Sequence, residues 1–203
     1  MHGIDVSHHQ GKIDWQQVAN FKLYEDTKID FVYLKATEGT SLVDDQFDRN
    51  WAACKKHNMK RGAYHFYQPW RDATRQADNF VNNVPKTSSD LPPVFDFEKE
   101  SKRSEEQTLE DISTWLNLVE KHFGKKPIIY TNNHFYKKYF KDNFETYPLW
   151  IADYSNLNLE DIPQKRLVFW QHSRAGFVKG ISEKVDFNVF LQEKEDLATL
   201  CED

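Results

Sequence analysis

The sequence contains little glycine, little cysteine and no long hydrophobic run. Only 7 of its 203 residues are glycine, and no Gly-rich phosphate-binding loop is present. The two cysteines, Cys54 and Cys201, do not make a disulfide framework, and their redox state stays open. No apolar stretch reaches the ~20 residues that a membrane-spanning helix needs. Basic residues are not in excess either: the net charge of −5 argues against a general nucleic-acid-binding protein.

Aromatic residues, in contrast, are abundant: 6 Trp, 9 Tyr and 15 Phe make up 15% of the chain. This content excludes a disordered chain, because disordered segments lack the large apolar side chains that form a core. Aromatic rings fill hydrophobic cores, and they also form stacking surfaces for flat ligands. Composition alone leaves both uses open.

Short apolar runs recur along the chain and predict strands. Their hydrophobicity is continuous rather than alternating, which is typical of strands covered on both faces. They span residues 3–7, 31–36, 62–67, 93–98, 127–131, 149–154, 167–171 and 185–190. Helical patterns follow the first five runs; they begin near residue 14 and span 45–57, 72–84, 104–123 and 134–144. The later connections are short and loop-like.

Strand–helix alternation predicts parallel strands with right-handed crossovers, and eight such strands suggest a closed barrel. The expected fold is α/β: a modified TIM-like barrel, with five β/α units followed by three further strands with few helices. Functional side chains then belong at the C-terminal ends of the strands. No linker or repeat divides the sequence, so residues 1–203 are expected to form a single domain.

The strongest local signal for chemistry is Asp-Phe-Glu at 96–98, at the end of an apolar strand. Side chains two residues apart on a strand point to the same face, about 6–7 Å apart, so Asp96 and Glu98 would both face the barrel interior. Two like charges there oppose each other, and one pKa is expected to rise. A protonated acid beside a carboxylate is the equipment for glycosidic bond cleavage. The alternative is a solvated strand end whose acids cap the next helix.

Two further acids lie within apolar strands: Asp5 in the first and Asp186 in the last. A buried charge is costly unless it has a partner or a role. The first and last strands of a closed barrel are neighbours, so Asp5 and Asp186 are expected to meet, opposite Asp96 and Glu98. Considered alone, Asp186 is better explained as a loop cap. Its assignment to a functional site depends on the expected closure of the barrel.

A metal site is the rival explanation for clustered carboxylates. It is disfavoured because no His or Asn stands at a matching strand position nearby. A Ser-His-Asp hydrolase is disfavoured as well, since the sequence has no Gly-x-Ser-x-Gly motif.

Aromatic residues gather at the same strand ends, among them Tyr64, Tyr130 and Trp150. A core role explains most such residues, although a buried Tyr hydroxyl needs a partner. Together with polar residues such as Gln171, these rings would suit a sugar that carries hydroxyl and amide groups.

Motifs along nearly the whole chain resemble glycoside hydrolase family 25. They are Gly-Ile-Asp-Val-Ser at 3–7, Lys-Ala-Thr-Glu-Gly at 35–39, Gly-Ala-Tyr-His-Phe at 62–66, Asp-Phe-Glu at 96–98, Ile-Tyr-Thr-Asn at 129–132, Leu-Trp-Ile-Ala at 149–152, Trp-Gln-His-Ser at 170–173 and Val-Asp-Phe-Asn at 185–188. The resemblance implies a lysozyme fold of five β/α units plus three strands. One departure is His172, where the family often has Tyr.

The resemblance also implies roles for single residues. Glu98 matches the general acid, and Asp96 matches its partner in the Asp-x-Glu motif. Asp5 and Asp186 match the other two acids of the active site. The candidate substrate-binding residues are Tyr64, Tyr130, Trp150, Gln171, Lys35 and Glu38. The family is regarded as retaining, with a proposed substrate-assisted route in which Asp96 orients the sugar's acetamido group. No metal and no cofactor are implied.

The sequence therefore predicts a single catalytic domain: an N-acetylmuramidase that cleaves the β-1,4 bond between N-acetylmuramic acid and N-acetylglucosamine. The expected partner is the peptidoglycan glycan strand, and a monomer is expected. A catalytically silent glycan-binding barrel and a hydrolase of another amino-sugar polymer, such as chitin, remain as alternatives. The sequence opens without a signal peptide. This predicts an extracellular, cell-wall or periplasmic enzyme whose leader is missing, or a phage-derived enzyme released at lysis.

Overall fold

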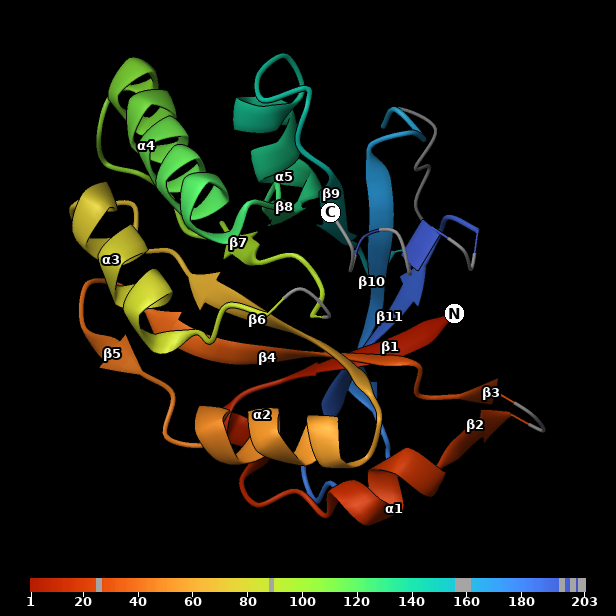
Figure 1. Cartoon of the computed structure of the whole chain (residues 1–203). Helices are drawn as coiled ribbons and strands as arrows, with labels where there is room; N and C mark the ends of the chain where they lie inside the picture. The colour runs from red at the N-terminus through yellow and green to blue at the C-terminus, as the bar shows by residue number, and fades with distance from the viewer. Residues whose placement is uncertain (25–26, 88–89, 156–161, 194–195, 198–199, 201–203) are drawn as a thin grey trace.

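The strands of the computed structural model, which describes residues 1–24, 27–87, 90–155, 162–193, 196–197 and 200, form a closed barrel (Figure 1). The barrel strands are β1 (His2–Val6), β4 (Phe31–Glu38), β6 (Lys60–Phe66), β7 (Val94–Asp96), β8 (Ile128–Asn132), β9 (Leu149–Ala152), β10 (Leu167–Gly176) and β11 (Val185–Phe190). Within the described residues, the sheet order is β1-β11-β10-β9-β8-β7-β6-β4, and a pairing of β1 with β4 closes it. The short strand β5 (Leu42–Val43) extends the sheet beside β4, and β2 (Lys22–Tyr24) pairs with β3 (Thr27–Lys28) as a separate hairpin.

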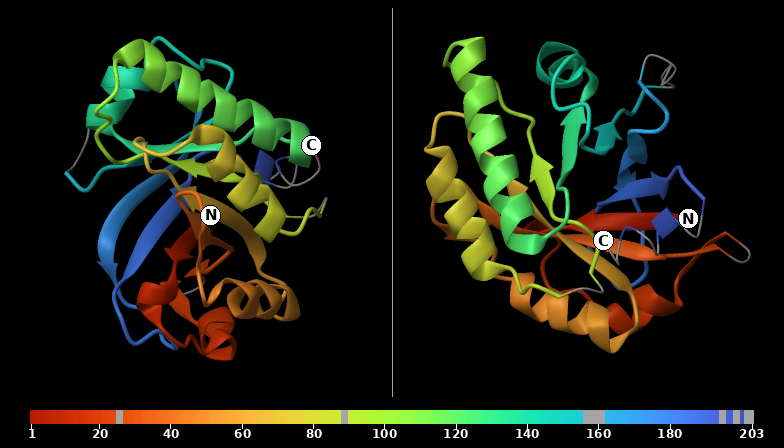
Figure 2. Two further views of the ribbon diagram at one scale, coloured as in Figure 1. Left: turned by 90° about the vertical axis from the view of Figure 1, so that its left-hand side faces the viewer. Right: turned by 45° about the horizontal axis from the view of Figure 1, so that its top comes forward.

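Helical segments follow the first five strands of the barrel. They are η1 (His8–Gln10) and α1 (Trp15–Asn20), α2 (Phe47–Lys56), α3 (Ala73–Asn83), α4 (Glu105–Phe123), and α5 (Asn133–Phe135) with η2 (Tyr136–Phe140). The views in Figures 1 and 2 agree that α3 and α4 lie side by side on the outside of the barrel. Between β9 and β11, the described connections contain no helix. The predicted modified TIM-like barrel, five β/α units followed by three strands with few helices, is confirmed.

The helix α4 shows how local sequence sets these boundaries. The Ser104 hydroxyl accepts a hydrogen bond from the Gln107 backbone N–H at 3.2 Å and so caps the first turn. Gly124 ends the helix in the left-handed region, at φ 74°, where a side chain would be strained. Between these ends, Ile112, Trp115 and other apolar side chains form one buried stripe that packs towards the barrel.

The last strand departs from the parallel pattern. β11 runs antiparallel to both of its neighbours, β10 and β1. The connection from β10 is residues 177–184, which is too short for the crossover that a parallel pair requires. The beginning of β11, rather than its end, therefore lies beside the C-terminal end of β1.

Two apolar layers follow from the alternation of side chains along the strands. Phe95 and Phe97 on or beside β7 point outwards and are fully buried under the helices, where Phe95 contacts the ring of Trp115. The inner layer fills the barrel below its open end; it includes Phe31, Tyr33, Val94, Ile128, Trp150, Phe169 and Phe190. The barrel is thus a packed core with a polar mouth.

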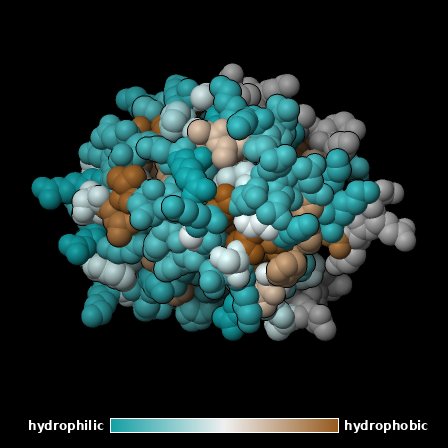
Figure 3. All heavy atoms as spheres, turned by 90° about the horizontal axis from the view of Figure 1, so that it is seen from below, coloured by the Kyte–Doolittle hydropathy of each residue, from teal (hydrophilic) through white to brown (hydrophobic). Residues whose placement is uncertain are grey.

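Few apolar side chains are left for the surface. The face seen from below, over α1 and α2, is mostly hydrophilic, with hydrophobic side chains in small separate patches (Figure 3). Cys54 lies fully buried on α2 as a free thiol, whereas Cys201 lies outside the described residues. In the part of the chain that the structure describes, no helix has the length and apolar character needed to cross a membrane.

Replacing Gly62 by Ala is expected to destabilise the protein by about 1–3 kcal/mol, as overpacking does in a filled core. A Cβ at this position would lie 2.1 Å from the Tyr33 ring inside the barrel. The free energy of unfolding from urea titration measures the effect. Ala52→Ser on the exposed side of α2 serves as the control and should stay within about 0.5 kcal/mol of the wild type. An equal stability of the two variants would contradict the close packing inferred at Gly62.

Candidate functional site

The open end of the barrel contains a cavity of about 300 Å³. All four acids singled out in the sequence line it: Asp5, Asp96, Glu98 and Asp186. The predicted residues Lys35, Tyr64, Tyr130, Trp150 and Gln171 also line it. Glu38 is not part of the cavity wall and lies behind Lys35, with which it forms an ion pair. Barrel closure therefore brings together side chains that are up to 181 positions apart in the sequence, Asp5 and Asp186.

Two strand arrangements position the acids. Asp5 on β1 is the direct register partner of Asp186 on β11, so that the two carboxyl groups start from neighbouring backbone positions. Asp96 is the last residue of β7, and Glu98 follows two positions later with its side chain in the same cavity. Asp96 and Asp5 are buried, whereas Glu98 and Asp186 keep partial contact with solvent.

Burial changes the ionisation of this group of acids. Loss of solvent raises the pKa of Asp96 well above its usual range, and the charges of Glu98 and Asp5 add to that rise. Burial also raises the pKa of Glu98, against the opposing effect of Lys99 and Lys35. Because ionisation of one acid disfavours ionisation of the other, the Asp96–Glu98 pair retains a proton at a pH where isolated carboxyls have lost theirs.

Burial and neighbouring charge also raise the pKa values of the second pair of acids, Asp5 and Asp186. Burial raises the pKa of Asp5 well above its usual range, and the neighbouring charge of Asp186 raises it further. Burial raises the pKa of Asp186 to about 6, with a smaller contribution from the charge of Glu98. Proton-holding carboxyls thus lie on both sides of the cavity.

Amide groups hold Asp5 in place. Its Oδ2 accepts one hydrogen bond from Gln171 Nε2 at 2.9 Å and another from Asn188 Nδ2 at 2.8 Å. Asn188 stands at a strand position beside the acids, so the expectation that no Asn does so is wrong. The signal that could have found it is its i, i+2 spacing from Asp186 on the same strand. The Asn188 oxygen is engaged as well, because it accepts a hydrogen bond from Trp150 Nε1 at 3.0 Å.

Gln171 connects the acids to the aromatic side of the cavity. Its side chain is 1% exposed, and its Oε1 accepts hydrogen bonds from the hydroxyls of Tyr130, at 2.9 Å, and Tyr154. Both the nitrogen and the oxygen of the Gln171 amide therefore bond to protein groups. This geometry is typical of a residue that positions other side chains. Tyr154, 48% exposed at the edge of the cavity, was not among the predicted site residues.

The predicted aromatic residues lie at different depths. Trp150 is 2% exposed and forms part of the inner apolar layer, with its ring 5.1 Å from that of Tyr130. Tyr64 is half-buried, and burial raises its pKa well above the usual value, as it does for Tyr130. Both hydroxyls accordingly stay protonated and can donate or accept hydrogen bonds.

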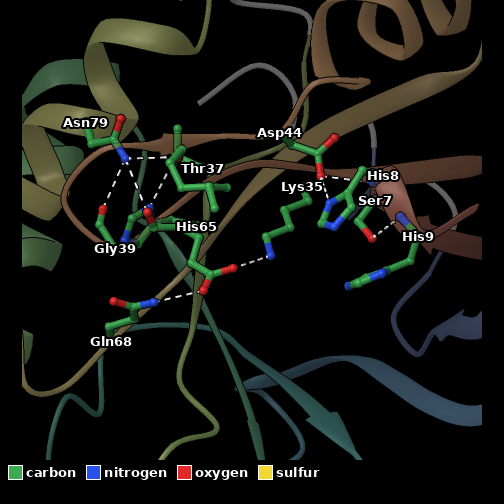
Figure 4. Close-up of polar contacts among 12 residues, drawn as sticks. Ser7, His8, His9, Lys35, Thr37, Gly39, Asp44, His65, Gln68 and Asn79 are labelled. Atoms are coloured by element: carbon green, nitrogen blue, oxygen red, sulfur yellow. Dashed lines mark hydrogen bonds and ion pairs between the residues drawn. The ribbon is translucent and has the colours of Figure 1, made fainter. Parts of the chain in front are cut away.

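A cationic flank borders Asp96 and Glu98. Lys35 Nζ lies 2.6 Å from Glu38 Oε2 and 4.9 Å from the centre of the Phe66 ring. Gln68 Nε2 donates to the other oxygen of Glu38 at 2.8 Å, so that the carboxylate paired with Lys35 is itself held in place (Figure 4). Its charge lowers the pKa of both Asp96 and Glu98 relative to what burial alone would give.

Two histidines, His8 and His9, follow β1, and neither was predicted at the site. His9 lines the cavity, and its backbone N–H donates to the Ser7 hydroxyl at 3.2 Å. His8 Nδ1 lies 2.7 Å from the buried carboxylate of Asp44, which also accepts from the His8 backbone N–H (Figure 4). These contacts fix the turn η1 directly after Asp5.

The cavity combines carboxyl groups whose protonated forms are favoured with one carboxyl oxygen that lacks a hydrogen-bond partner among the described residues. Within the described ranges, no group of three or more His, Cys, Asp or Glu side chains has the geometry to hold a metal ion. Asp96 Oδ1 is buried without a hydrogen-bond partner among the described residues. An unpartnered buried carboxyl oxygen is costly, so a donor group of a bound molecule is its expected partner. The site can thus bind a polar N–H or O–H group beside a protonated acid.

The sequence matches one family model, described as "Glycosyl hydrolases family 25", over residues 4–181. The chain is 42% identical to the Escherichia coli K12 protein YegX, over 97% of this chain and 72% of that protein. It is 32% identical to "Lysozyme M1" of Streptomyces globisporus, over 93% of this chain and 67% of that protein.

A solved structure shows the same architecture. The family 25 glycosyl hydrolase from Bacillus anthracis superimposes with a TM-score of 0.88 and 32% sequence identity, covering 98% of this chain and 92% of that chain.

Replacing Lys35 by Met is expected to raise the pKa of both Asp96 and Glu98, because it removes a positive charge that stabilises their ionised forms. Titration of the carboxyl carbons by ¹³C NMR measures both values. Lys121→Met on the exposed side of α4 is the matched control and should leave both values unchanged. Unchanged or lowered values in the Lys35 variant would contradict an electrostatic role for this side chain.

Proposed function

Since the chain belongs to glycosyl hydrolases family 25 and is a glycoside hydrolase, we propose that it cleaves the β-1,4 bond between N-acetylmuramic acid and N-acetylglucosamine in peptidoglycan. The similarity to Lysozyme M1 supports this substrate class. The observation that supports the chemistry most directly is the buried Asp96 oxygen without a partner, beside the proton-holding Glu98. This combination fits a substrate that presents an amide N–H next to the bond to be broken.

Glu98 is proposed as the general acid. Its raised pKa favours the protonated form, and its partial exposure lets it reach a leaving oxygen at the mouth of the cavity. It would donate its proton to the glycosidic oxygen as the bond to the anomeric carbon breaks. In the second half of the reaction, the resulting carboxylate would take a proton from the attacking water.

Asp96 is proposed to orient the acetamido group of the muramic acid residue. Its free Oδ1 would accept the acetamido N–H, which directs the carbonyl oxygen of that group towards the anomeric carbon. This hydrogen bond favours the ionised form of Asp96 and leaves the shared proton on Glu98. The substrate's own carbonyl then acts as the nucleophile, and two displacements give net retention. Two acids that lie two residues apart and line the same cavity suit this route better than a nucleophile–acid pair on opposite sides of the bond.

The remaining site residues are proposed to stabilise charge and hold the sugar. Asp186, with a pKa of about 6, would be mostly ionised at neutral pH and would favour positive charge developing on the sugar ring. Asp5, held by two amide donors, would position Asp186. Tyr64 and Tyr130 would bind sugar hydroxyl groups, and Trp150 would support them from below. Gln171, Lys35 and Glu38 would act by positioning and by charge.

All of these residues come from one barrel, which supports the proposal that residues 1–203 act as a single catalytic domain. A peptidoglycan substrate implies action at the cell wall, after export or after release at lysis. A silent glycan-binding protein and a chitin hydrolase are separate outcomes of the substrate experiments that follow.

Glu98→Gln is expected to lower the release of reducing ends from purified peptidoglycan by about 10²- to 10⁴-fold, the usual contribution of a general acid. Glu100→Gln, at an exposed position two residues later, is the control and should retain activity. Circular dichroism verifies that both variants fold. Activity of the Glu98 variant close to that of the wild type would remove this residue from the proposed mechanism.

Wild-type protein is assayed in parallel on chitin oligomers. Faster turnover of chitin than of peptidoglycan would replace the muramidase proposal by a chitinase. Binding of muropeptides without release of reducing ends would support the silent glycan-binding protein instead.

Asp96→Asn is expected to reduce kcat on peptidoglycan by about 100-fold or more, because an amide cannot stabilise the positive charge that builds up on the acetamido nitrogen. KM should change little, since the amide oxygen still accepts the N–H hydrogen bond. Steady-state kinetics on a defined muramyl oligosaccharide separates the two parameters. An increase in KM at unchanged kcat would indicate a binding role and exclude the nucleophile-orienting role.

A further inference from the structure

Two cationic side chains of the described residues line the cavity, and their charges are compensated differently. Lys35 is 6% exposed and forms a 2.6 Å ion pair with Glu38. Arg174, on β10, is exposed and forms no ion pair within 4.0 Å with any residue that the structure describes. The charge of Lys35 is thus engaged by the protein, whereas that of Arg174 is available at the mouth.

The local backbone aims Arg174 at the cavity. The register of β10 against β11 shifts between Gln171 and Ser173 and again between Ser173 and Gly176. Bulges of this kind redirect side chains and are common beside active sites. The hydrogen bond from the Ala175 backbone N–H to the Ser173 hydroxyl, 3.2 Å long, stabilises the irregular segment. Arg174 is a lining residue because of this distortion.

Tyr154 holds the guanidinium group in a defined place. The Arg174 guanidinium carbon lies 5.4 Å from the centre of the Tyr154 ring, and the Tyr154 hydroxyl is anchored on Gln171. A cation–π contact of this kind uses the ring face and leaves the guanidinium N–H donors free. Arg174 is therefore a preorganised donor of two parallel hydrogen bonds, the geometry that matches a carboxylate.

The proposed substrate supplies a carboxylate in one of its two sugars. N-acetylmuramic acid differs from N-acetylglucosamine by a lactyl ether, which ends in a carboxylate or bears a peptide that has carboxylates of its own. We propose that Arg174 binds the carboxylate of this substituent and thereby selects muramyl glycans over glycans built from N-acetylglucosamine alone. This inference rests on the proposed muramidase function and adds a specificity residue to it.

A second role for Arg174 has to be separated from this one. Its charge also acts on Asp186 and opposes the rise in the pKa of that acid. Loss of that effect would change the hydrolysis of every substrate, with or without a carboxylate. Recognition of the carboxylate predicts instead that the loss is confined to substrates that present it.

The test compares Arg174→Gln with the wild type on a peptide-free muramyl tetrasaccharide and on the same glycan with its lactyl carboxyls converted to methylamides. The variant should lose about 10- to 100-fold in kcat/KM on the free carboxylate, mainly through KM, as expected for a charge-assisted bidentate contact. It should remain close to the wild type on the amidated glycan. Arg174→Lys should recover part of the loss. Arg75→Gln on the exposed side of α3 is the control and should behave as the wild type on both glycans.

A peptide-bearing muramyl glycan forms the third arm and distinguishes the two sources of carboxylate. Loss confined to the peptide-free glycan identifies the lactyl carboxylate, and loss confined to the peptide-bearing glycan identifies the peptide. An equal loss of kcat/KM on the free and the amidated glycan, with no further loss on the peptide-bearing glycan, overturns the inference. An unchanged kcat/KM on all three glycans overturns it as well.

Binding of the same glycans, measured by calorimetry, keeps the two proposals distinguishable. A wild type that cleaves none of the glycans but binds the free carboxylate more tightly than the methylamide, through Arg174, overturns the muramidase proposal and retains the specificity residue. If the wild type cleaves normally and the Arg174 substitution does not change binding, the muramidase proposal is retained and the specificity residue is overturned.

Discussion

Burial of four carboxyl groups around a cavity of about 300 Å³ is the constraint on which the site depends. Charge in such a place is costly, and burial accordingly raises the pKa of each of the four acids. The neighbouring side chains supply what limits the cost: two amide donors on Asp5, and the positive charge of Lys35 near Asp96 and Glu98. The result is a set of acids whose protonated forms are favoured, and acid catalysis of glycoside cleavage requires a protonated acid.

The position of this group depends on how the barrel closes. The short connection before β11 makes that strand antiparallel, and its beginning then pairs with the end of β1. Had β11 continued the parallel pattern, Asp186 would lie at the opposite end of the barrel from Asp5. Below the acids, Trp150, Phe169 and their neighbours fill the interior and exclude water from the floor of the cavity. Aromatic side chains thus pack below the polar mouth of the barrel as well as at its rim.

The sequence predicted the layout of the barrel well, because continuous apolar runs and helical periodicity record burial directly. The two-residue repeat of a strand likewise predicted that the side chains of Asp96 and Glu98 both point into the barrel. The sequence did not assign Asn188, Tyr154 or Arg174 to the site. Asn188 and Tyr154 act through hydrogen bonds to residues on other strands, and Arg174 reaches the cavity through two irregularities in β10. Apart from the i, i+2 spacing of Asn188 from Asp186, no local pattern indicates these contacts.

By itself, the sequence determined the order of strands and helices along the chain and the candidate acids of the site. These follow from periodicity and from the cost of placing Asp5 or Asp186 in an apolar strand. Only the tertiary structure decided which amides hold the acids, and that both ends of the Gln171 amide bond to protein groups. It also decided that the charge of Arg174 is left without an ion pair in the described part of the chain. The physical reason is distance: hydrogen bonds and ion pairs act over a few ångströms, and only barrel closure brings residues 5, 171 and 188 within that range.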